Sequence, residues 1–226
     1  MPIIWIIFIG FMILSWLIGQ RLKSKFTAFS KIPINFGLSG KEIAERMLRE
    51  SNVEGVNVVS VPGKLSDHYN PANRTVNLSP EVYNGRSVAA AAVAAHECGH
   101  AVQHDRAYAW LQMRSQLVPV VSITSKWVQW VLLAGILLVQ TMPGILLAGI
   151  VLFALTTLFS FITLPVEIDA SRRALVWLSS TGVTNRETHP KAQEALRWAA
   201  YTYVVAALAS LATLLYYIMI FMGRRD

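Results

Sequence analysis

Three long stretches without any ionisable side chain dominate this sequence. Ile3–Gly19 contains none, Trp127–Val166 runs for 40 residues without Asp, Glu, Lys, Arg or His, and Trp198–Gly223 adds another 26 such residues. About 20 apolar residues in a helix are enough to cross the hydrocarbon core of a bilayer. Only 15% of the residues are charged, against about 25% in soluble domains. The sequence therefore predicts an integral membrane protein and excludes a soluble enzyme, a disordered chain and a disulfide scaffold.

The uncharged stretches divide into four predicted spans. Ile3–Gly19 has no basic start and no small-x-small cleavage site, and Arg21 follows it, so we interpret it as a retained span rather than a signal peptide. The 40-residue stretch is too long for one helix, and Thr141–Gly144, with its Pro-Gly pair, breaks it into a hairpin. We expect the remaining spans near Trp127–Gln140, Ile145–Leu164 and Trp198–Met222.

Two polar regions, 21–126 and 166–197, are separated by the hairpin and must therefore emerge on the same side of the membrane. Both are rich in Lys and Arg, whereas the hairpin tip carries no charge, so the positive-inside rule places both in the cytosol. The basic residues adjoin apolar spans, and the net charge of +7 thus indicates anionic lipid headgroups rather than nucleic acid as a partner. The predicted parts are a first span at 1–20, a cytosolic region at 21–126, a transmembrane hairpin at 127–165, a second cytosolic segment at 166–197 and a last span with its tail at 198–226.

Helix signals mark both ends of the first polar region. Ser39 and Glu42 have the spacing of a capping box, which predicts an amphipathic helix that continues to about Ser51. Ser79-Pro80 is typical of a helix start, because proline is favoured at the first helical position. A long helix is expected from Ser87 to about Leu117.

Strand signals lie between these helices. Residues 56–61 are rich in valine, and residues 65–69 and 75–78 flank Asn70-Pro71-Ala72-Asn73, which is typical of a hairpin turn. Two or three short strands are expected. The sequence thus predicts a mainly α membrane protein, with four transmembrane helices and a small α+β cytosolic domain.

The long predicted helix carries the motif His96-Glu97-Cys98-Gly99-His100. Positions i and i+4 lie about 40° apart around a helix and roughly 6 Å apart along it, so two imidazoles can converge on one metal ion. The glutamate beside them can take a proton from a metal-bound water and later deliver it to a leaving amine. The alternative is that the motif binds no metal and consists of two histidines near a surface carboxylate. It is disfavoured because the motif follows the apolar run Val88–Ala95, where polar groups are costly unless something binds them.

A catalytic zinc site needs a third protein ligand. His104 continues the i+4 series but lies about 12 Å along the helix from His96, so we expect a polar neighbour of the site or a solvated residue. Cys98 points to another face of the helix and is expected to be a packed thiol. Glu167 is the first charge after the 40-residue stretch, and from position alone it is either a ligand or, like Asp169, a carboxylate that solvates the end of a span. We expect Asp67, His68 and His189 to be ordinary surface residues.

Six segments stand out as motifs, namely Asp67–Pro71, Leu78–Pro80, Ala94–His104, Leu164–Glu167, Asp169–Leu175 and Ala199–Val204. Together they resemble the YugP-like zinc metallopeptidases of bacterial membranes. The resemblance covers essentially the whole chain and includes the order of the spans.

More distantly, the chain is similar to the HtpX and CAAX-prenyl-protease group of gluzincins, whose third zinc ligand is a glutamate on a later helix. That resemblance implies Glu167 as the third ligand. It also implies an aspartate that orients a zinc-binding histidine where this chain has Ser171, so Ser171 or Asp169 would have to substitute. A His-Pro…Arg segment of that group stabilises the oxyanion, which makes His189 a candidate for that role.

These observations predict a zinc-dependent metalloendopeptidase in a bacterial cell membrane, with its active site facing the cytosol. Its partners would be a polypeptide substrate, membrane-associated or misfolded, and the lipid bilayer; the sequence makes no prediction of oligomeric state. Two alternatives are a zinc-binding membrane scaffold or regulator that cuts nothing and, less favoured because no predicted span contains an Asp, a site-2-type intramembrane protease. Zn²⁺ would be bound by His96, His100 and Glu167, with Glu97 as general base and acid.

Overall fold

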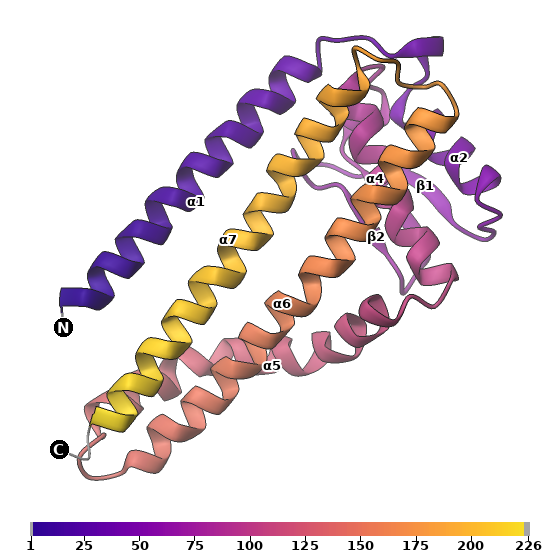
Figure 1. Cartoon of the computed structure of the whole chain (residues 1–226). Helices are drawn as coiled ribbons and strands as arrows, with labels where there is room; N and C mark the ends of the chain where they lie inside the picture. Colours follow the sequence, from indigo (N-terminus) through magenta and orange to yellow (C-terminus); the bar gives the residue numbers. More distant parts are fainter. Residues whose placement is uncertain (1, 224–226) are drawn as a thin grey trace. The chain divides into compact units, whose positions relative to one another are not determined.

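The computed structural model describes residues 2–223, and it describes side chains from Trp5 onward. The chain is mainly helical with one small sheet, as predicted (Figure 1). Its elements are α1 (Pro2–Phe29), the short 3-10 helix η1 (Asn35–Gly37), α2 (Gly40–Glu50), β1 (Asn57–Ser60), β2 (His68–Asn70), β3 (Thr75–Leu78), α3 (Pro80–Tyr83), α4 (Val88–Asp105), α5 (Ala109–Leu137), α6 (Pro143–Ser180) and α7 (His189–Met222).

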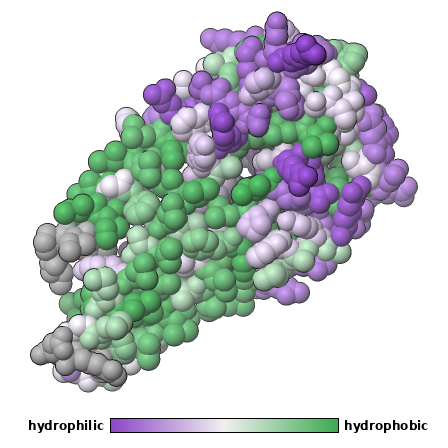
Figure 2. All heavy atoms as spheres, viewed as in Figure 1, coloured by the Kyte–Doolittle hydropathy of each residue, from purple (hydrophilic) through white to green (hydrophobic). Residues whose placement is uncertain are grey.

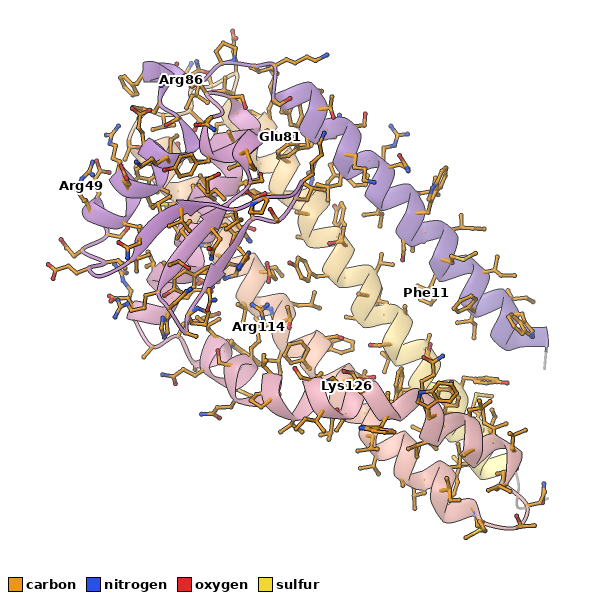
Figure 3. All side chains as sticks on the ribbon, turned by 180° about the vertical axis from the view of Figure 1, so that it is seen from behind. Phe11, Arg49, Glu81, Arg86, Arg114 and Lys126 are labelled. Carbon is orange, nitrogen blue, oxygen red and sulfur yellow. The ribbon has the colours of Figure 1, made fainter. Side chains whose placement is uncertain are left out.

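Four helices in the described part of the chain are long and apolar enough to cross a membrane. They are Trp5–Phe29, Ala109–Leu137, Pro143–Ser180 and His189–Met222. In Figure 2, hydrophobic residues cover the long helices, and hydrophilic residues gather over the elements around the sheet. Figure 3 labels Phe11 on α1, the charged Arg49, Glu81 and Arg86 in the part with the sheet, and the basic Arg114 and Lys126 on α5.

The chain forms two compact units. The first comprises the described parts of Met1–Leu17, Gln112–Leu164 and Thr202–Asp226, and the second comprises Ile18–Leu111 and Pro165–Tyr201.

Within the first unit, α5 and α6 form the predicted hairpin. The predicted break is confirmed, because α5 ends at Leu137 and α6 begins at Pro143. A Cβ atom on Gly135 would lie 2.5 Å from the Cα of Leu146, so the absence of a side chain there permits the two helices to approach closely. The small apolar core of this hairpin is formed by Val128, Leu132, Leu146 and Ile150.

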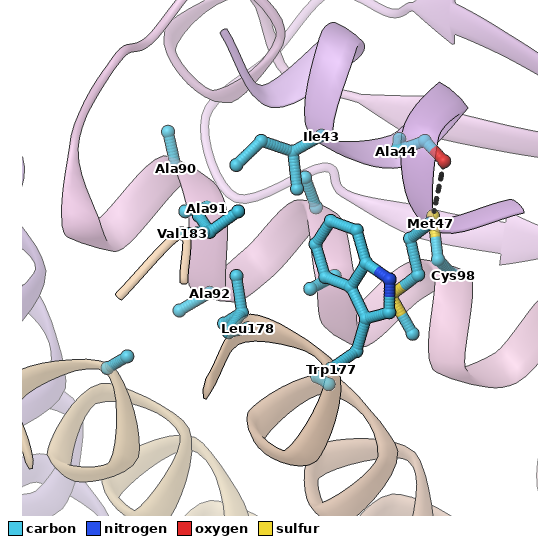
Figure 4. Close-up of a cluster of buried hydrophobic side chains, with 14 of the residues drawn as sticks. Ile43, Ala44, Met47, Ala90, Ala91, Ala92, Cys98, Trp177, Leu178 and Val183 are labelled. Carbon is cyan, nitrogen blue, oxygen red and sulfur yellow. Dashed lines mark hydrogen bonds between the residues drawn. The ribbon is translucent and has the colours of Figure 1, made fainter. Parts of the chain in front are cut away.

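Helix α4 lies at the centre of the second unit. Its alanine-rich first half is almost completely inaccessible to solvent, and the small side chains allow α2 and α6 to pack against it (Figure 4). Cys98 is buried on this face, where its thiol donates to the carbonyl oxygen of Ala44 at 3.5 Å. The prediction of a packed thiol is confirmed, and burial raises its pKa above the usual range.

The sheet has three strands in the order β1-β3-β2. Strand β1 pairs with β3 in parallel and β2 pairs with β3 antiparallel, with Tyr69 opposite Val76. The predicted turn between β2 and β3 is confirmed, and the side chain of Asn70 accepts a hydrogen bond from the amide of Ala72 at 2.9 Å. The capping box at the start of α2 is also confirmed, since Ser39 and Glu42 bond reciprocally.

The predicted helix from Ser87 to about Leu117 is wrong. Helix α4 ends at Asp105, and the amide of Tyr108 bonds to the carbonyl of Gln103, which closes the helix in a Schellman motif. Ala107 occupies the left-handed position of this motif, with φ of 50°, where glycine is the usual residue. No glycine or proline marks this end, so nothing in the residue pattern indicated that the helix stops here.

The other long helices extend past the predicted spans. Helix α6 continues through Pro165 to Ser180, and α7 begins at His189, nine residues before the predicted span at Trp198. Pro80 begins α3 as predicted, but the Ser79 side chain makes no capping bond. Its hydroxyl donates to Asp67 instead, at 3.0 Å.

Gly99 sets the spacing between α4 and α6. A Cβ atom at this position would lie 2.6 Å from the carbonyl oxygen and 3.0 Å from the Cα of Ala170. Both atoms belong to the backbone and cannot rotate away, so any larger residue must push the two helices apart.

We therefore expect Gly99→Ala to destabilise the protein by about 1–3 kcal/mol through overpacking. Thermal unfolding of the detergent-solubilised protein, followed by intrinsic fluorescence, measures the effect. Gly19→Ala is the matched control, since it is also helical and a Cβ atom there meets nothing within 4 Å. Equal melting temperatures for the two variants would contradict the close approach of α4 and α6.

Candidate metal centre

His96, His100 and Glu167 form a cluster with the composition of a metal site. Each offers one ligand atom, and the three atoms lie within 4.8 Å of one another. The Nε2 atoms of the two histidines lie 3.3 and 3.5 Å from Oε2 of Glu167. Zinc ligands at about 2.0–2.1 Å and tetrahedral angles stand about 3.3–3.4 Å apart, so these separations fit zinc coordination.

Two helices supply these three side chains. His96 and His100 are one turn apart on α4, and Glu167 comes from α6 two residues after Pro165. The close contact at Gly99 brings α6 against the same turn of α4 that carries the histidines. The Glu167 side chain is 4% exposed and that of His96 is 14% exposed, so the cluster opens to solvent mainly at His96.

Gln103 fixes the orientation and tautomer of His100. Its amide nitrogen donates to the carbonyl of Val166 and to Oδ2 of Asp169, each at 2.8 Å, so its amide oxygen faces the imidazole. That oxygen lies 3.0 Å from Nδ1 of His100, and since it can only accept, the proton must be on Nδ1. The Nε2 lone pair of His100 is then directed at the cluster, as metal binding requires.

Asp169 and Ser171 occupy the positions predicted to substitute for the missing aspartate, and each acts on a different histidine. Asp169 reaches His100 through Gln103 and is itself held by the Arg173 guanidinium at 2.6 Å. The hydroxyl of Ser171 lies 3.1 Å from Nδ1 of His96. One side chain from α6 therefore supports each imidazole of α4.

Glu97 lies beside the cluster and is 8% exposed. Its Oε2 accepts a hydrogen bond from the Tyr69 amide on β2 at 2.9 Å. Burial raises the pKa of Glu97 to about 7, and His96 lowers it only in part. The edge strand β2 thus holds Glu97, the carboxylate of the motif, which lies outside the cluster of three ligands.

Three contacts attach the β2–β3 hairpin near this glutamate. The Tyr69 hydroxyl bonds to Nδ1 of His104 at 2.8 Å, and Arg74 pairs with Asp105 at 3.5 Å. Asp67 accepts bonds from both the amide and the hydroxyl of Ser79. His104 is exposed and also bonds to Tyr69, so it fits both expectations, a solvated residue and a polar neighbour of the site. Asp67 is a part-buried structural residue rather than an ordinary surface acid.

His189 lies outside the cluster. Its Nδ1 contacts the Thr184 hydroxyl at 3.0 Å, at the start of α7. An oxyanion role for His189 remains a prediction.

Sequence reasoning missed Gln103 entirely. Its signal was its place on the helix, three residues after His100 and hence on the same face. Gln103 is completely buried, which is costly for an amide unless all of its hydrogen bonds are made.

Comparison with known proteins shows the family of the chain. Residues 4–222 match the family described as "Putative neutral zinc metallopeptidase", and the chain belongs to that family. It is also 41% identical over 206 residues to the "Putative membrane protease YugP" of Bacillus subtilis (strain 168), an alignment that covers 91% of both chains. The resemblance to the YugP-like zinc metallopeptidases is thereby confirmed. No solved structure matches the chain.

We expect Gln103→Leu to weaken zinc binding by about 10- to 100-fold, because His100 loses the acceptor that fixes its tautomer. Competition with a chelator of known affinity measures the change. Gln112→Leu makes the same chemical change at an exposed position of α5 and serves as the control. Unchanged affinity in Gln103→Leu would show that the amide has no part in orienting His100.

Proposed function

We propose that this protein is a membrane-embedded, zinc-dependent metalloendopeptidase of the gluzincin type. The observation that carries the proposal is the convergence of His96, His100 and Glu167 on one point, with Glu97 adjacent. Two imidazoles and one carboxylate are the protein ligands of several catalytic zinc sites, in which the fourth position is left to water. The family to which the chain belongs supports the same chemistry.

His96, His100 and Glu167 would hold the ion. When bound, zinc lowers the pKa of a coordinated water toward about 7 and polarises the carbonyl to be attacked. The chain itself supplies the orientation, since Gln103 and Ser171 bond to the outward nitrogens of the two imidazoles.

Glu97 would move the proton. With Oε2 engaged by the Tyr69 amide, we assign Oε1 to accept a proton from the attacking water and to return it to the leaving amine. A hydrogen bond from a backbone amide restrains the carboxylate without competing for its proton. Tyr69 is thus a positioning residue for Glu97.

The polypeptide substrate would approach beside β2. This strand lies at one edge of the sheet, and an extended peptide can pair with such an edge. Its Tyr69 amide is already bonded to Glu97, so the peptide would have to pair with other backbone groups of the edge.

We further propose four membrane crossings, with the parts 21–126 and 166–197 in the cytosol of a bacterial cell. The four apolar helices and the relative named as a membrane protease support the membrane setting. The side is inferred from the excess of Lys and Arg in the two polar parts over the uncharged hairpin tip.

Metal content tests the ligand set. We expect about one zinc per chain in the purified protein by mass spectrometry, with loss of zinc in His96→Ala and in Glu167→Ala. Circular dichroism checks that the variants are folded. Zinc retained in Glu167→Ala would move the third ligand elsewhere, and no zinc in the wild type after reconstitution would refute the metal centre.

Glu97→Gln tests catalysis separately from binding. Since the amide cannot accept the proton, peptide cleavage should fall at least about 100-fold while zinc content stays at the wild-type level. Glu187→Gln, at an exposed position between α6 and α7, is the control for the same substitution. Full complementation of a deletion strain by Glu97→Gln would favour the alternative of a zinc-binding scaffold or regulator that cuts nothing.

Cysteine labelling tests the sidedness. Thr141→Cys in the hairpin turn should react with a membrane-impermeant maleimide in intact cells, whereas Arg186→Cys should react only after permeabilisation. Both positions are exposed, and the native Cys98 is buried, so the wild type gives the background. The reverse pattern would place the metal centre outside the cytosol.

A further inference from the structure

A groove between α6 and the first turns of α7 begins next to the metal centre. It has a volume of about 650 Å³. Its wall includes Ile168, which follows Glu167 directly, and Ser171, whose hydroxyl contacts His96. From Ile168 it follows α6 to Ser180, which is about 18 Å of helix. An extended peptide advances about 3.3 Å per residue, so the groove has the length of about five peptide residues.

Two arginines give the groove positive charge, which the nearby acid Glu194 offsets only in part because its main partner is Lys25. Arg172 and Arg197 line it, and none of the described residues in its wall is an Asp or a Glu. Neither guanidinium forms an ion pair among the described residues. The acids nearest to them in sequence are taken by other cations, because Asp169 pairs with Arg173 at 2.6 Å and Glu194 pairs with Lys25 at 2.9 Å.

The rest of the wall suits a polypeptide. Leu175 and Leu196 give it apolar surface, and polar side chains that can bond to a peptide backbone alternate with them, namely Ser179, Ser180 and Gln193. Apolar surface with a few placed polar and charged groups is typical of a site that binds and orients a ligand.

We propose that this groove binds the substrate next to the scissile bond, and that Arg172 and Arg197 select substrates that carry a carboxylate there. The carboxylate can be an Asp or Glu side chain or a free C-terminus, since a guanidinium binds both in the same way. This inference rests on the proposed peptidase function and specifies its substrate class.

The location of the groove favours a peptide over a lipid headgroup. The wall takes one residue, Ala200, from the uncharged part of α7. Every residue that α6 contributes comes after Glu167, so none comes from the uncharged segment 143–166, along which acyl chains would lie. A lipid site would be expected to include that segment. The groove instead continues from the metal centre into the polar part of the chain.

The test uses the zinc-loaded, full-length protein in an uncharged detergent and three matched pools of quenched fluorogenic peptides. The pools differ only in Glu, Gln or Lys at the varied positions, and each is made with a free and with an amidated C-terminus. We expect the wild type to cleave the Glu pool about five- to tenfold better than the Gln pool in kcat/KM, with most of the difference in KM. If the carboxylate is the C-terminus, the free and amidated peptides differ instead.

Arg172→Glu and Arg197→Glu should abolish or reverse this preference while zinc content stays at the wild-type value. Arg186→Glu makes the same charge change outside the groove and should keep the preference. Cleavage of all pools at equal rates would overturn the groove assignment alone. The groove assignment would also be overturned if the arginine variants lost only their binding to anionic lipid vesicles. No cleavage of any pool by the wild type would overturn the proposed function and this inference with it.

Discussion

The contact between α4 and α6 at Gly99 and Ala170 is the constraint on which the metal centre depends. Two histidines one turn apart on a helix can face one ion, but they need a third ligand from elsewhere in the chain. Here it comes from α6, and its distance from the histidines is set by how closely the two backbones approach. With no side chain on Gly99, the Ala170 backbone comes near enough for Glu167 to lie 3.3 and 3.5 Å from the two imidazoles. The alanines of α4 extend the same principle along the second unit, where small side chains let α2 and α6 pack against it.

The same two helices also orient the ligands. Gln103 on α4 bonds to both Val166 and Asp169 on α6, and Ser171 on α6 reaches back to His96 on α4. Each bond therefore links the helix that carries the histidines to the helix that carries the glutamate. A displacement of α6 would change the position of Glu167 and the orientation of both imidazoles together. The geometry of the metal centre therefore depends on the packing of the α4–α6 interface as a whole, not on three ligands placed independently.

Much of the fold and of the candidate site could be predicted from sequence, because the relevant signals are local. Spacing on one helix predicted the pairing of His96 with His100, and the Pro-Gly pair predicted the turn before α6. From its position alone, Glu167 could be either a metal ligand or a carboxylate that solvates the end of a span. The family resemblance favoured the ligand. The predictions that failed concern either an unusual backbone conformation or contacts between residues far apart in the sequence. The end of α4 was missed because an alanine adopts the left-handed conformation there. Gln103 was missed because the two groups that hold its amide nitrogen lie more than 60 residues away.

The electrostatics of the site explain why such a cluster lies in an apolar helix. Burial is the main cause of the raised pKa of Glu97, and the carboxylates of Glu167 and Asp67 raise it further, while the partial compensation comes from His96 and the Tyr69 amide. Desolvated carboxylates that repel one another are costly, and hydrogen bonds offset only part of that cost. A divalent cation at the point shared by His96, His100 and Glu167 would attract both glutamates and reverse the sign of the local field. For Glu97 the surroundings are thus unfavourable without a cation and favourable with one, whereas the two histidines already lower the pKa of Glu167. The difference at Glu97 would link metal binding to the stability of the α4–α6 interface.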